Sequence, residues 1–473
     1  MKIGNKFYTV LAGFAFFAHM AAAQETTTNI FGGADSSSAT EIKAEGSNLD
    51  VVLNPNASAP AGDAFFFGNG NTIGSLKTTG TPSSWNIGDG NTVIDINRAD
   101  SGEYEAFVNT GSMTLTGNSQ IEFVNSTGNS AVAKVDLGEF TFAGSDNLGD
   151  YGLHFKTNAV VEGTDFTAKT NGASPLPPAI WVTNNSNVVY NVKSSTFKTN
   201  TEMSVDKGST LTVNGVLYMT AYGSLLNVNG TFNYNSTNLY LSEVAITGTL
   251  NSKSSVSLTG KGSQISGSGV MNSEGVLELN NGSDFKILDN AKVNLTKTNA
   301  TVNLKDKSEL TIAAKNAIGN NGKLVSLAIR AEALSAANAT LNVLADNKFD
   351  KLYFNRSSNT TLTITVADGA HLYFNGLDLS SYTAGKITLN IKDFVEQSIF
   401  FKDITGWEDI TTVSLSDTAG NTYAKDDLYL VEGNYIDGTN GYWLSTSAIP
   451  EPSTWAAIFG ALALALAVYR KRR

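Results

Sequence analysis

Short runs in which two apolar residues flank a single residue recur through the middle of the chain. They are Leu211-Thr212-Val213, Leu226-Asn227-Val228, Val244-Ala245-Ile246, Val256-Ser257-Leu258, Leu277-Glu278-Leu279, Phe285-Lys286-Ile287, Val293-Asn294-Leu295, Val302-Asn303-Leu304 and Leu310-Thr311-Ile312. An apolar residue at every second position is typical of a β-strand with one buried face. Turn signals such as Asn214-Gly215 and Asn229-Gly230 separate the runs. The pattern therefore predicts many short strands joined by tight turns.

Two all-β architectures fit this spacing. In a parallel β-helix, each coil uses two or three short strands and neighbouring coils share one core, whereas an antiparallel β-sandwich also gives strands 8–12 residues apart. The segments GSTLTVNGVLY (Gly208 to Tyr218) and GSLLNVNGTFN (Gly223 to Asn233) are near copies, and residues 179–449 contain no proline. Proline is excluded from central strands. The internal repeat and the uninterrupted run favour the parallel β-helix, with Asn or Ser side chains stacked along its turns.

The pattern divides the chain into regions. Residues 24–60 are a polar N-terminal segment, which we expect to be mobile or a poorly formed first coil. Residues 61–345 hold the repetitive β-solenoid, and residues 346–447 a β-rich C-terminal module whose longer strands close its end. One helix is predicted from Leu324 to Ala337, where it would cap the solenoid.

The C-terminal residues 448–473 have a different character. An apolar run from Ala456 to Val468 carries no charge, and a membrane-spanning helix is predicted over residues 455–469. The residues around this run form a Pro-Glu-Pro motif, two flanking aromatic residues and a basic end, namely Pro450, Glu451, Pro452, Trp455, Tyr469, Arg470, Lys471, Arg472 and Arg473. Because Pro-Glu-Pro cannot continue into a helix, the motif stays extended and accessible.

These three parts, in this order, resemble the PEP-CTERM sorting signal of Gram-negative bacteria. The resemblance covers only residues 448–473, and it implies a partner, a membrane-embedded exosortase that cuts near Pro450 and releases or transfers the protein. The alternative is a permanent anchor that is never cut. The predicted helix of 15 residues is short for that purpose, because a membrane span usually needs about 20 residues.

The N-terminus has the features of a secretory signal peptide over residues 1–23. Lys2 and Lys6 form a basic start, the segment from Phe7 to Met20 is apolar, and the small residues Ala21 and Ala23 mark the cleavage site. The body resembles autotransporter passenger domains and other bacterial surface β-helices, although it lacks a transporter barrel of its own. The chain is therefore expected to cross the inner membrane, to be anchored briefly, and to reach the cell surface or extracellular matrix.

Composition excludes several classes of site. The chain contains no cysteine, so disulfides and thiolate metal sites are ruled out. The two terminal signals hold six of the 32 basic residues and one of the 43 acidic residues, which leaves a net charge of −16 on the body. Such a body repels nucleic acid and anionic lipid. We expect no cofactor.

Residues with catalytic or ligand-binding chemistry are few in the body. Histidine is limited there to His154 and His371. The candidate carboxylates are Asp95, Asp100, Glu103, Asp146, Asp150, Asp426 and Asp427, and a loose calcium site is conceivable from Asp346, Asn347 and Asp350. Acidic residues at turns are usually solvated, and the calcium candidates lack the spacing of an EF-hand loop. No catalytic residue is assigned.

Three functions remain open. The first is a non-enzymatic structural protein of the surface or matrix, which a featureless polar surface would favour. The second is an adhesin or glycan-binding protein, with exopolysaccharide or another surface glycan as partner; exposed aromatic platforms near Trp181, Tyr190 or Tyr240 would favour it. The third is a polysaccharide lyase or hydrolase, which needs two carboxylates across a cleft. A groove with converging Asp, Lys and aromatic side chains would favour this enzyme.

Overall fold

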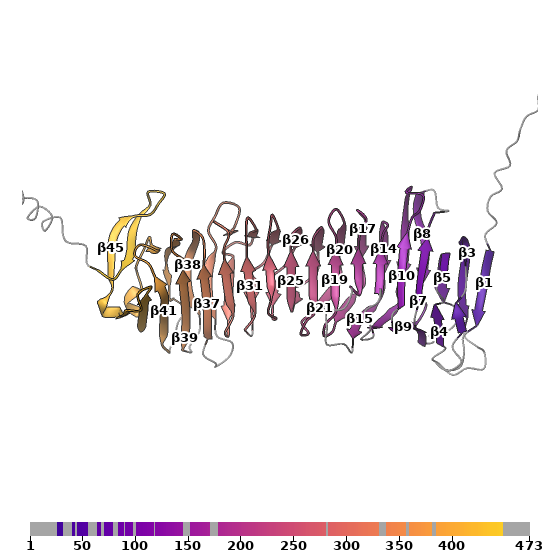
Figure 1. The fold of residues 1–473 in the computed structure, drawn as a ribbon, viewed down its shortest axis with the longest axis horizontal. Coiled ribbons are helices and arrows are strands. Elements are labelled where there is room, and N and C mark those ends of the chain that lie inside the picture. The colour runs from indigo at the N-terminus through magenta and orange to yellow at the C-terminus, as the bar shows by residue number, and fades with distance from the viewer. Residues whose placement is uncertain are drawn as a thin grey trace, which may run out of the picture.

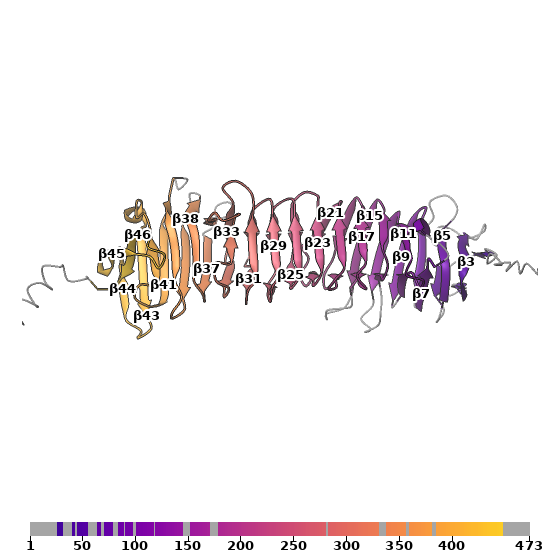
Figure 2. The same ribbon diagram turned by 90° about the horizontal axis from the view of Figure 1, so that it is seen from above.

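The chain winds into a long rod of stacked coils, with its N-terminal strands at one end and its C-terminal strands at the other (Figures 1 and 2). This computed structural model describes residues 26–447, apart from residues 32–39, 43–44, 55–63, 68–70, 79–83, 89, 98–100, 118, 145–151, 171–177, 281, 331–336, 356–358 and 381–384. Strands of successive coils pair in parallel, so that each wall of the rod is one continuous ladder. The predicted parallel β-helix is confirmed, and the antiparallel sandwich is excluded.

Three ladders of parallel strands make the walls. Ladder 1 contains β1 (Thr26–Phe31), β3 (Glu45–Asn54), β5 (Asn71–Thr78), β7 (Gly90–Asp95), β10 (Ser119–Val124), β13 (Gly152–Phe155), β16 (Ile180–Val182), β19 (Glu202–Val205), β22 (Leu225–Val228), β25 (Glu243–Ile246), β28 (Ser263–Ile265), β31 (Asp284–Ile287), β34 (Glu309–Ile312), β37 (Ala337–Val343), β39 (Thr360–Val366), β41 (Ile387–Phe394) and β43 (Thr412–Asp417). Ladder 2 contains β8 (Ser101–Val108), β11 (Ser130–Asp136), β14 (Ala159–Glu162), β17 (Asn187–Tyr190), β20 (Thr210–Val213), β23 (Thr231–Tyr234), β26 (Thr249–Ser252), β29 (Val270–Ser273), β32 (Lys292–Leu295) and β35 (Ile318–Gly319). Ladder 3 contains β2 (Thr40–Ile42), β4 (Ala64–Phe67), β6 (Ser84–Gly88), β9 (Ser112–Gly117), β12 (Glu139–Gly144), β15 (Asp165–Thr170), β18 (Ser194–Phe197), β21 (Val216–Met219), β24 (Leu239–Leu241), β27 (Val256–Leu258), β30 (Leu277–Leu279), β33 (Thr301–Lys305), β36 (Ser326–Arg330), β38 (Asn347–Asn355), β40 (Leu372–Asp378) and β42 (Ile399–Phe401).

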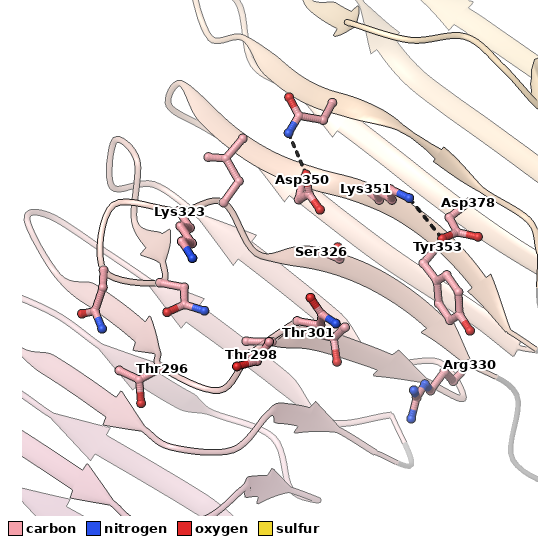
Figure 3. Close-up of a pocket in the computed structure, with 16 residues that line it drawn as sticks. Thr296, Thr298, Thr301, Lys323, Ser326, Arg330, Asp350, Lys351, Tyr353 and Asp378 are labelled. Carbon is pink, nitrogen blue, oxygen red and sulfur yellow. Dashed lines mark hydrogen bonds and ion pairs between the residues drawn. The ribbon is translucent and has the colours of Figure 1, made fainter.

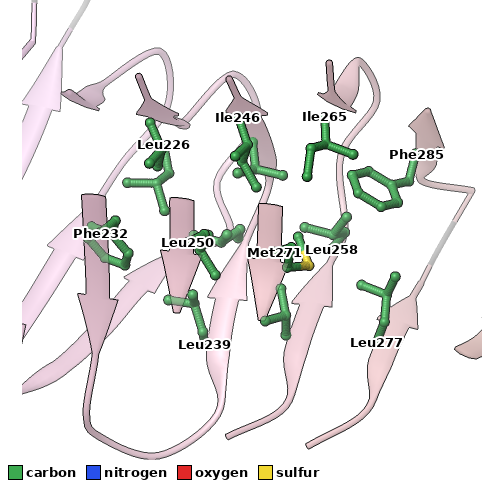
Figure 4. Close-up of a cluster of buried hydrophobic side chains, with 14 of the residues drawn as sticks. Leu226, Phe232, Leu239, Ile246, Leu250, Leu258, Ile265, Met271, Leu277 and Phe285 are labelled. Atoms are coloured by element: carbon green, nitrogen blue, oxygen red, sulfur yellow. The ribbon is translucent and has the colours of Figure 1, made fainter. Parts of the chain in front are cut away.

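The predicted apolar triplets are all strands of these ladders, and their apolar side chains fill the rod. Each of these side chains is at most 1% exposed. Figure 4 shows how one coil supplies Leu226, Phe232 and Leu239 from its three walls, and how the next coil places Ile246, Leu250 and Leu258 beside them. The alternation of buried and outward residues therefore produces one continuous hydrophobic core.

The near-copy segments do not mark successive coils. The strand that begins one segment, β20, pairs with β23, so that Thr210 faces Thr231. The strand that begins the other segment, β22, belongs to ladder 1 and pairs with β25, so that Leu225 faces Glu243. The repeated unit in the sequence is thus a strand-turn-strand element, which the fold uses at different corners of the coil.

Side-chain amides stack along the outside of ladder 2. The Nδ2 of Asn251 donates to Oδ1 of Asn233 at 2.8 Å, and the same bond continues from Asn272 to Asn251 at 2.8 Å and from Asn294 to Asn272 at 2.9 Å. We call these four residues the asparagine stack. They lie on strands, whereas the sequence predicted asparagines stacked along turns. Asn214 fits that prediction, because it donates at 2.6 Å to Asn191, which lies at the corresponding turn of the preceding coil.

The two ends of the rod differ from its middle. Ladder 2 ends at the two-residue strand β35, and ladder 1 continues through the longer strands β37, β39 and β41. Parallel pairing then gives way to antiparallel pairing of β44 (Thr422–Ala424) with β43, and of β45 (Tyr429–Asn434) and β42 with β46 (Asn440–Ser445). Short 3-10 helices cover Trp407–Asp409 and Lys425–Asp427. We call residues 422–447 the cap.

Some expectations for the flanks change. The segment expected to be a helix from residue 324 to 337 contains strand β36 instead, because Leu327 and Ile329 alternate with outward side chains and fill the core. The polar N-terminal segment holds β1, β2 and β3, each paired in parallel with a later strand. Pairing continues across residue 345, since β36 pairs with β38 and β37 with β39. None of the helices in the described residues is long and apolar enough to span a membrane.

Candidate functional site

An open groove of about 930 Å³ lies on the outside of ladder 3. Its walls come from the turn between β32 and β33, the hairpin between β35 and β36, and the outer faces of β36, β38 and β40 (Figure 3). Its lining is polar and contains a single aromatic ring, and consists of Thr296, Thr298, Asn299, Ala300, Thr301, Asn320, Asn321, Lys323, Leu324, Ser326, Arg330, Asp350, Lys351, Tyr353, Asn375 and Asp378.

The hairpin that closes one side of the groove is held by local bonds. The backbone N–H groups of Asn320 and Lys323 donate to each other's carbonyl oxygens at 2.9 and 2.8 Å. Between them, Asn321 and Gly322 take positive φ values of 46° and 82°, as a tight reversal of the chain requires. The side chain of Asn320 donates to the carbonyl oxygen of Lys297 at 2.9 Å, which fastens the hairpin to the preceding coil.

Charges of both signs meet in the groove. The Lys351 ammonium lies 3.4 Å from the Asp378 carboxylate, and the Nδ2 of Asn375 donates to Asp350 at 2.6 Å. A hydrogen bond from Ser380 is the main reason that the pKa of Asp378 is below its ordinary value, and Lys351 adds to this effect although partial burial opposes it. The Nε of Arg330 is buried and has no hydrogen-bond partner among the described residues.

A second surface feature lies on the same ladder, away from the groove. Tyr218 and Tyr240 stand on neighbouring strands with their rings stacked, 6.1 Å between centroids and 15° between planes. The side chain of Tyr218 is 44% exposed, and the nearby Tyr222 is 80% exposed. Asn238 donates to the hydroxyl of Tyr240 at 3.3 Å. Tyr240, which the sequence analysis named, is half-buried and forms a surface aromatic pair with the exposed Tyr218.

The other two aromatic candidates are structural. Tyr190 is fully buried, its hydroxyl lies 2.9 Å from that of Ser195, and burial raises its pKa. The Trp181 ring stacks on His154 at 4.4 Å, and its Nε1 donates to Asp206 at 3.1 Å. Tyr190 is thus enclosed in the core, and one face of the Trp181 ring is covered by His154.

The two histidines have separate environments. His154 is 5% exposed; its Nε2 lies 2.9 Å from the Thr183 hydroxyl and its Nδ1 lies 3.6 Å from the Glu122 carboxylate. His371 lies near the cap, where its Nδ1 is 2.8 Å from Asp346. Burial opposes ionisation of Asp346, but hydrogen bonds from Lys315 and His371 together lower its pKa. Each histidine is thus held inside a network of polar contacts.

The remaining acidic candidates that the structure describes do not converge. Asp95 accepts the backbone N–H groups of Asn97 and Ser126, each at 3.1 Å, and Asp427 accepts that of Ala424 at 3.0 Å. Glu103 is exposed on β8, and Asp426 lies in the second 3-10 helix. Asp100, Asp146 and Asp150 lie outside the described residues.

The calcium candidates are also separated. Asn347 is buried, and its amide bonds to the backbone of Ala314, Ala317 and Ala345. Asp346 faces Lys315 and His371, whereas Asp350 faces the groove. In the described parts of the chain, no group of three or more His, Cys, Asp or Glu side chains is arranged to hold a metal ion.

The residues of the two terminal signals lie outside the described residues. This applies to Ala21 and Ala23 of the cleavage site, to the motif Pro450-Glu451-Pro452, to Trp455 and Tyr469, and to the basic end from Arg470 to Arg473. Strand β46 ends at Ser445, and Ser447 is the last described residue.

Comparison with known proteins found no match, whether to family models, to curated proteins or to solved structures. The sequence analysis also missed the groove. Its residues come from four coils, and none of them forms a motif, because polar residues at outward positions are common along the whole chain. Two features of the sequence distinguish this region. The apolar segment at residue 318 is shorter than those of the preceding coils, and the turn signal Asn320-Asn321-Gly322 follows it.

Proposed function

We propose that this protein is an exported, non-enzymatic structural protein of the cell surface or extracellular matrix, directed there by a C-terminal signal that an exosortase processes. The observation that carries the proposal is the unbroken parallel pairing from β1 to β43, which makes a long rod with a single core. In such a rod, each coil is stabilised by its neighbours, so length is gained without a separate core for each domain.

The surface chemistry supports a structural role. Neither histidine is placed beside a pair of carboxylates in the groove, and the lowered pKa of Asp378 keeps this side chain ionised at neutral pH. A general acid for glycoside cleavage needs a raised pKa instead. The groove does bring Asp, Lys and Tyr side chains together, as the enzyme hypothesis requires, but its chemistry is better suited to holding a ligand.

The proposal is tested by the fate of the C-terminus. In the native host, mass analysis of surface-extracted protein is expected to find an end near Pro450. Replacement of Pro450, Glu451 and Pro452 by alanine should leave the chain in the membrane fraction with Arg473 intact. An unprocessed C-terminus on wild-type protein at the surface would overturn the exosortase step. Recovery of the wild-type protein from the cytoplasm would overturn export.

A further inference from the structure

The groove on ladder 3 lies where the coil changes its construction. Ladder 2 ends at β35, and the coil that follows has two long strands, β37 and β38, in place of three short ones. The residues between β35 and β36 do not belong to any of the three ladders. They fold outward as the hairpin closed by Asn320 and Lys323. The groove is thus formed by a local surplus of chain beside the flat outer face of ladder 3.

The shape of the groove fits an extended ligand. It crosses four neighbouring strands of ladder 3, β33, β36, β38 and β40, which at about 4.8 Å per strand spacing corresponds to roughly 14 Å. Figure 3 shows Arg330 and Tyr353 at one end, and Lys323 with Thr296 at the other. Its volume of about 930 Å³ lies in the range of ligand sites, about 300–1,000 Å³.

The lining offers donors and acceptors in mixture. Threonine and serine hydroxyls do both, asparagine amides do both, the carboxylates of Asp350 and Asp378 accept, and Lys323, Lys351 and Arg330 donate. Because positive and negative groups alternate and Lys351 is paired with Asp378, neither a polyanion nor a polycation gains much from the site. The net charge of −16 on the body further disfavours a polyanion.

An uncharged sugar chain matches these conditions. Its hydroxyl groups both donate and accept, so they can bond to the amides, the carboxylates and the Arg330 side chain that line the groove. Its rings have apolar faces that stack on an aromatic side chain, and the half-buried Tyr353 offers such a ring at one end of the groove. We propose that the groove between β33 and β40 binds a segment of an uncharged polysaccharide, with Tyr353 as the stacking platform and Arg330, Asp350 and Asp378 as its polar contacts.

Affinity electrophoresis of the purified full chain tests this assignment. Native gels would contain dextran, hydroxyethylcellulose, xyloglucan or galactomannan as uncharged probes, and polygalacturonate as the anionic probe. Retardation is expected in at least one uncharged gel. Loss of the stacked ring in Tyr353→Ala should weaken binding about tenfold, while Tyr353→Phe, which keeps the ring, should stay within about threefold of wild type.

Two further variants separate the groove from other surfaces and from folding defects. Lys323 is exposed on the hairpin, so Lys323→Ala should weaken binding a few-fold without changing the thermal unfolding curve. Tyr240→Ala is the matched control, because it removes a ring from the other tyrosine site on the same ladder and should leave retardation unchanged.

Three results would overturn the proposal: no retardation by any uncharged probe, retardation by polygalacturonate alone, or binding that Tyr240→Ala abolishes and Tyr353→Ala leaves intact. The inference goes beyond the structural role and does not depend on it. It can fail on gels while the C-terminal processing is confirmed in cells, and the reverse result is equally distinguishable.

Discussion

The middle of the rod and its C-terminal part use the same parallel pairing but stabilise it with different side chains. From β16 to β34, each coil has three walls, and the asparagine stack joins four coils on the outside. From β37 to β41, the strands have seven to nine residues, and aromatic rings stack inside: Phe349 on Phe374 at 5.8 Å, and Phe374 on Phe401 at 5.7 Å.

This difference shows that pairing alone does not fix the cross-section of the coil. The short strands of the middle hold asparagines in register on their outer face, whereas the longer strands of the C-terminal coils hold stacked phenylalanine rings in register inside. At the junction between the two constructions, the surplus chain has no place in the core. The groove therefore lies at the change of cross-section, and both constructions contribute residues to it.

The largest expected effect comes from the core of the C-terminal coils. Phe374→Ala removes the central ring of the stack and should lower the free energy of unfolding by about 3–5 kcal/mol. Leu250→Ala, in the fully buried core of the middle, should cost about 2–5 kcal/mol. Because each coil contacts only its neighbours, hydrogen exchange should rise near the substituted coil. An equal rise of hydrogen exchange along the whole rod would show that the two regions do not unfold separately.

A smaller effect is expected where glycines of neighbouring coils meet at a corner of the middle region. A Cβ on Gly248 would lie 2.0 Å from the carbonyl oxygen of Gly230. Gly248→Ala should therefore push two coils apart and cost about 1–3 kcal/mol of unfolding free energy. The control is Gly319→Ala at the junction, where the nearest atom would lie 3.9 Å away. Equal chemical denaturation curves for the two variants would show that the corner tolerates the extra methyl group.

The asparagine stack gives a third test of the difference between the regions. Asn251→Ala removes one donated and one accepted bond, so it should cost about 1–2 kcal/mol and raise hydrogen exchange in β23 and β29. Asn338 is the matched control in the C-terminal coils, because it points outward from β37 and is exposed. Asn338→Ala should change the unfolding free energy by less than about 0.5 kcal/mol. If both variants lost a similar amount of unfolding free energy, the asparagine stack would contribute no more to stability than a single exposed asparagine.

The smallest effects are expected from pH, and they have opposite signs in the two regions. Burial raises the pKa of Glu202 in the middle, although Asn227 donates to it. The folded state therefore favours protonated Glu202, and its contribution to stability falls as the pH rises from about 4.5, the ordinary pKa, towards the raised pKa of the folded state. In the cap, the hydrogen bond from Lys348 lowers the pKa of Asp437 to about 2. Its contribution is complete above the ordinary pKa of 3.8 and is lost as the pH falls towards 2.

Site-resolved hydrogen exchange between pH 2.5 and 6 measures both changes. Glu202→Gln should remove the pH dependence around β19, and Asp437→Asn should remove that of β45 and β46. Each effect should be below about 1 kcal/mol, because Asp437 is exposed and surface ion pairs contribute little. Acidification is expected to destabilise the cap through Asp437 and to stabilise the coils around β19 through Glu202. The opposite change in either region would show that the pKa shift given for its carboxylate is wrong.

The sequence by itself determined the strands, the turns and the buried faces. The alternation in Leu211-Thr212-Val213 and its counterparts leaves only one face that can be buried, so local pattern decides which side chains enter the core. The absence of proline from residue 179 to residue 449 also matches the continuous ladders. The signals at both termini remain predictions, because they lie outside the described residues.

Only the tertiary structure decided which strands pair, and therefore what the surface contains. A 15-residue sequence repeat does not reveal that Thr210 faces Thr231, since the partner depends on how many walls the coil has. For the same reason, the chain gives no sign that Tyr353 and Arg330 share a groove with Thr296. The segment around Leu327 illustrates the limit: an isolated stretch of helix-forming residues reads as a helix, but the ladder on either side offers it strand partners and a core to fill.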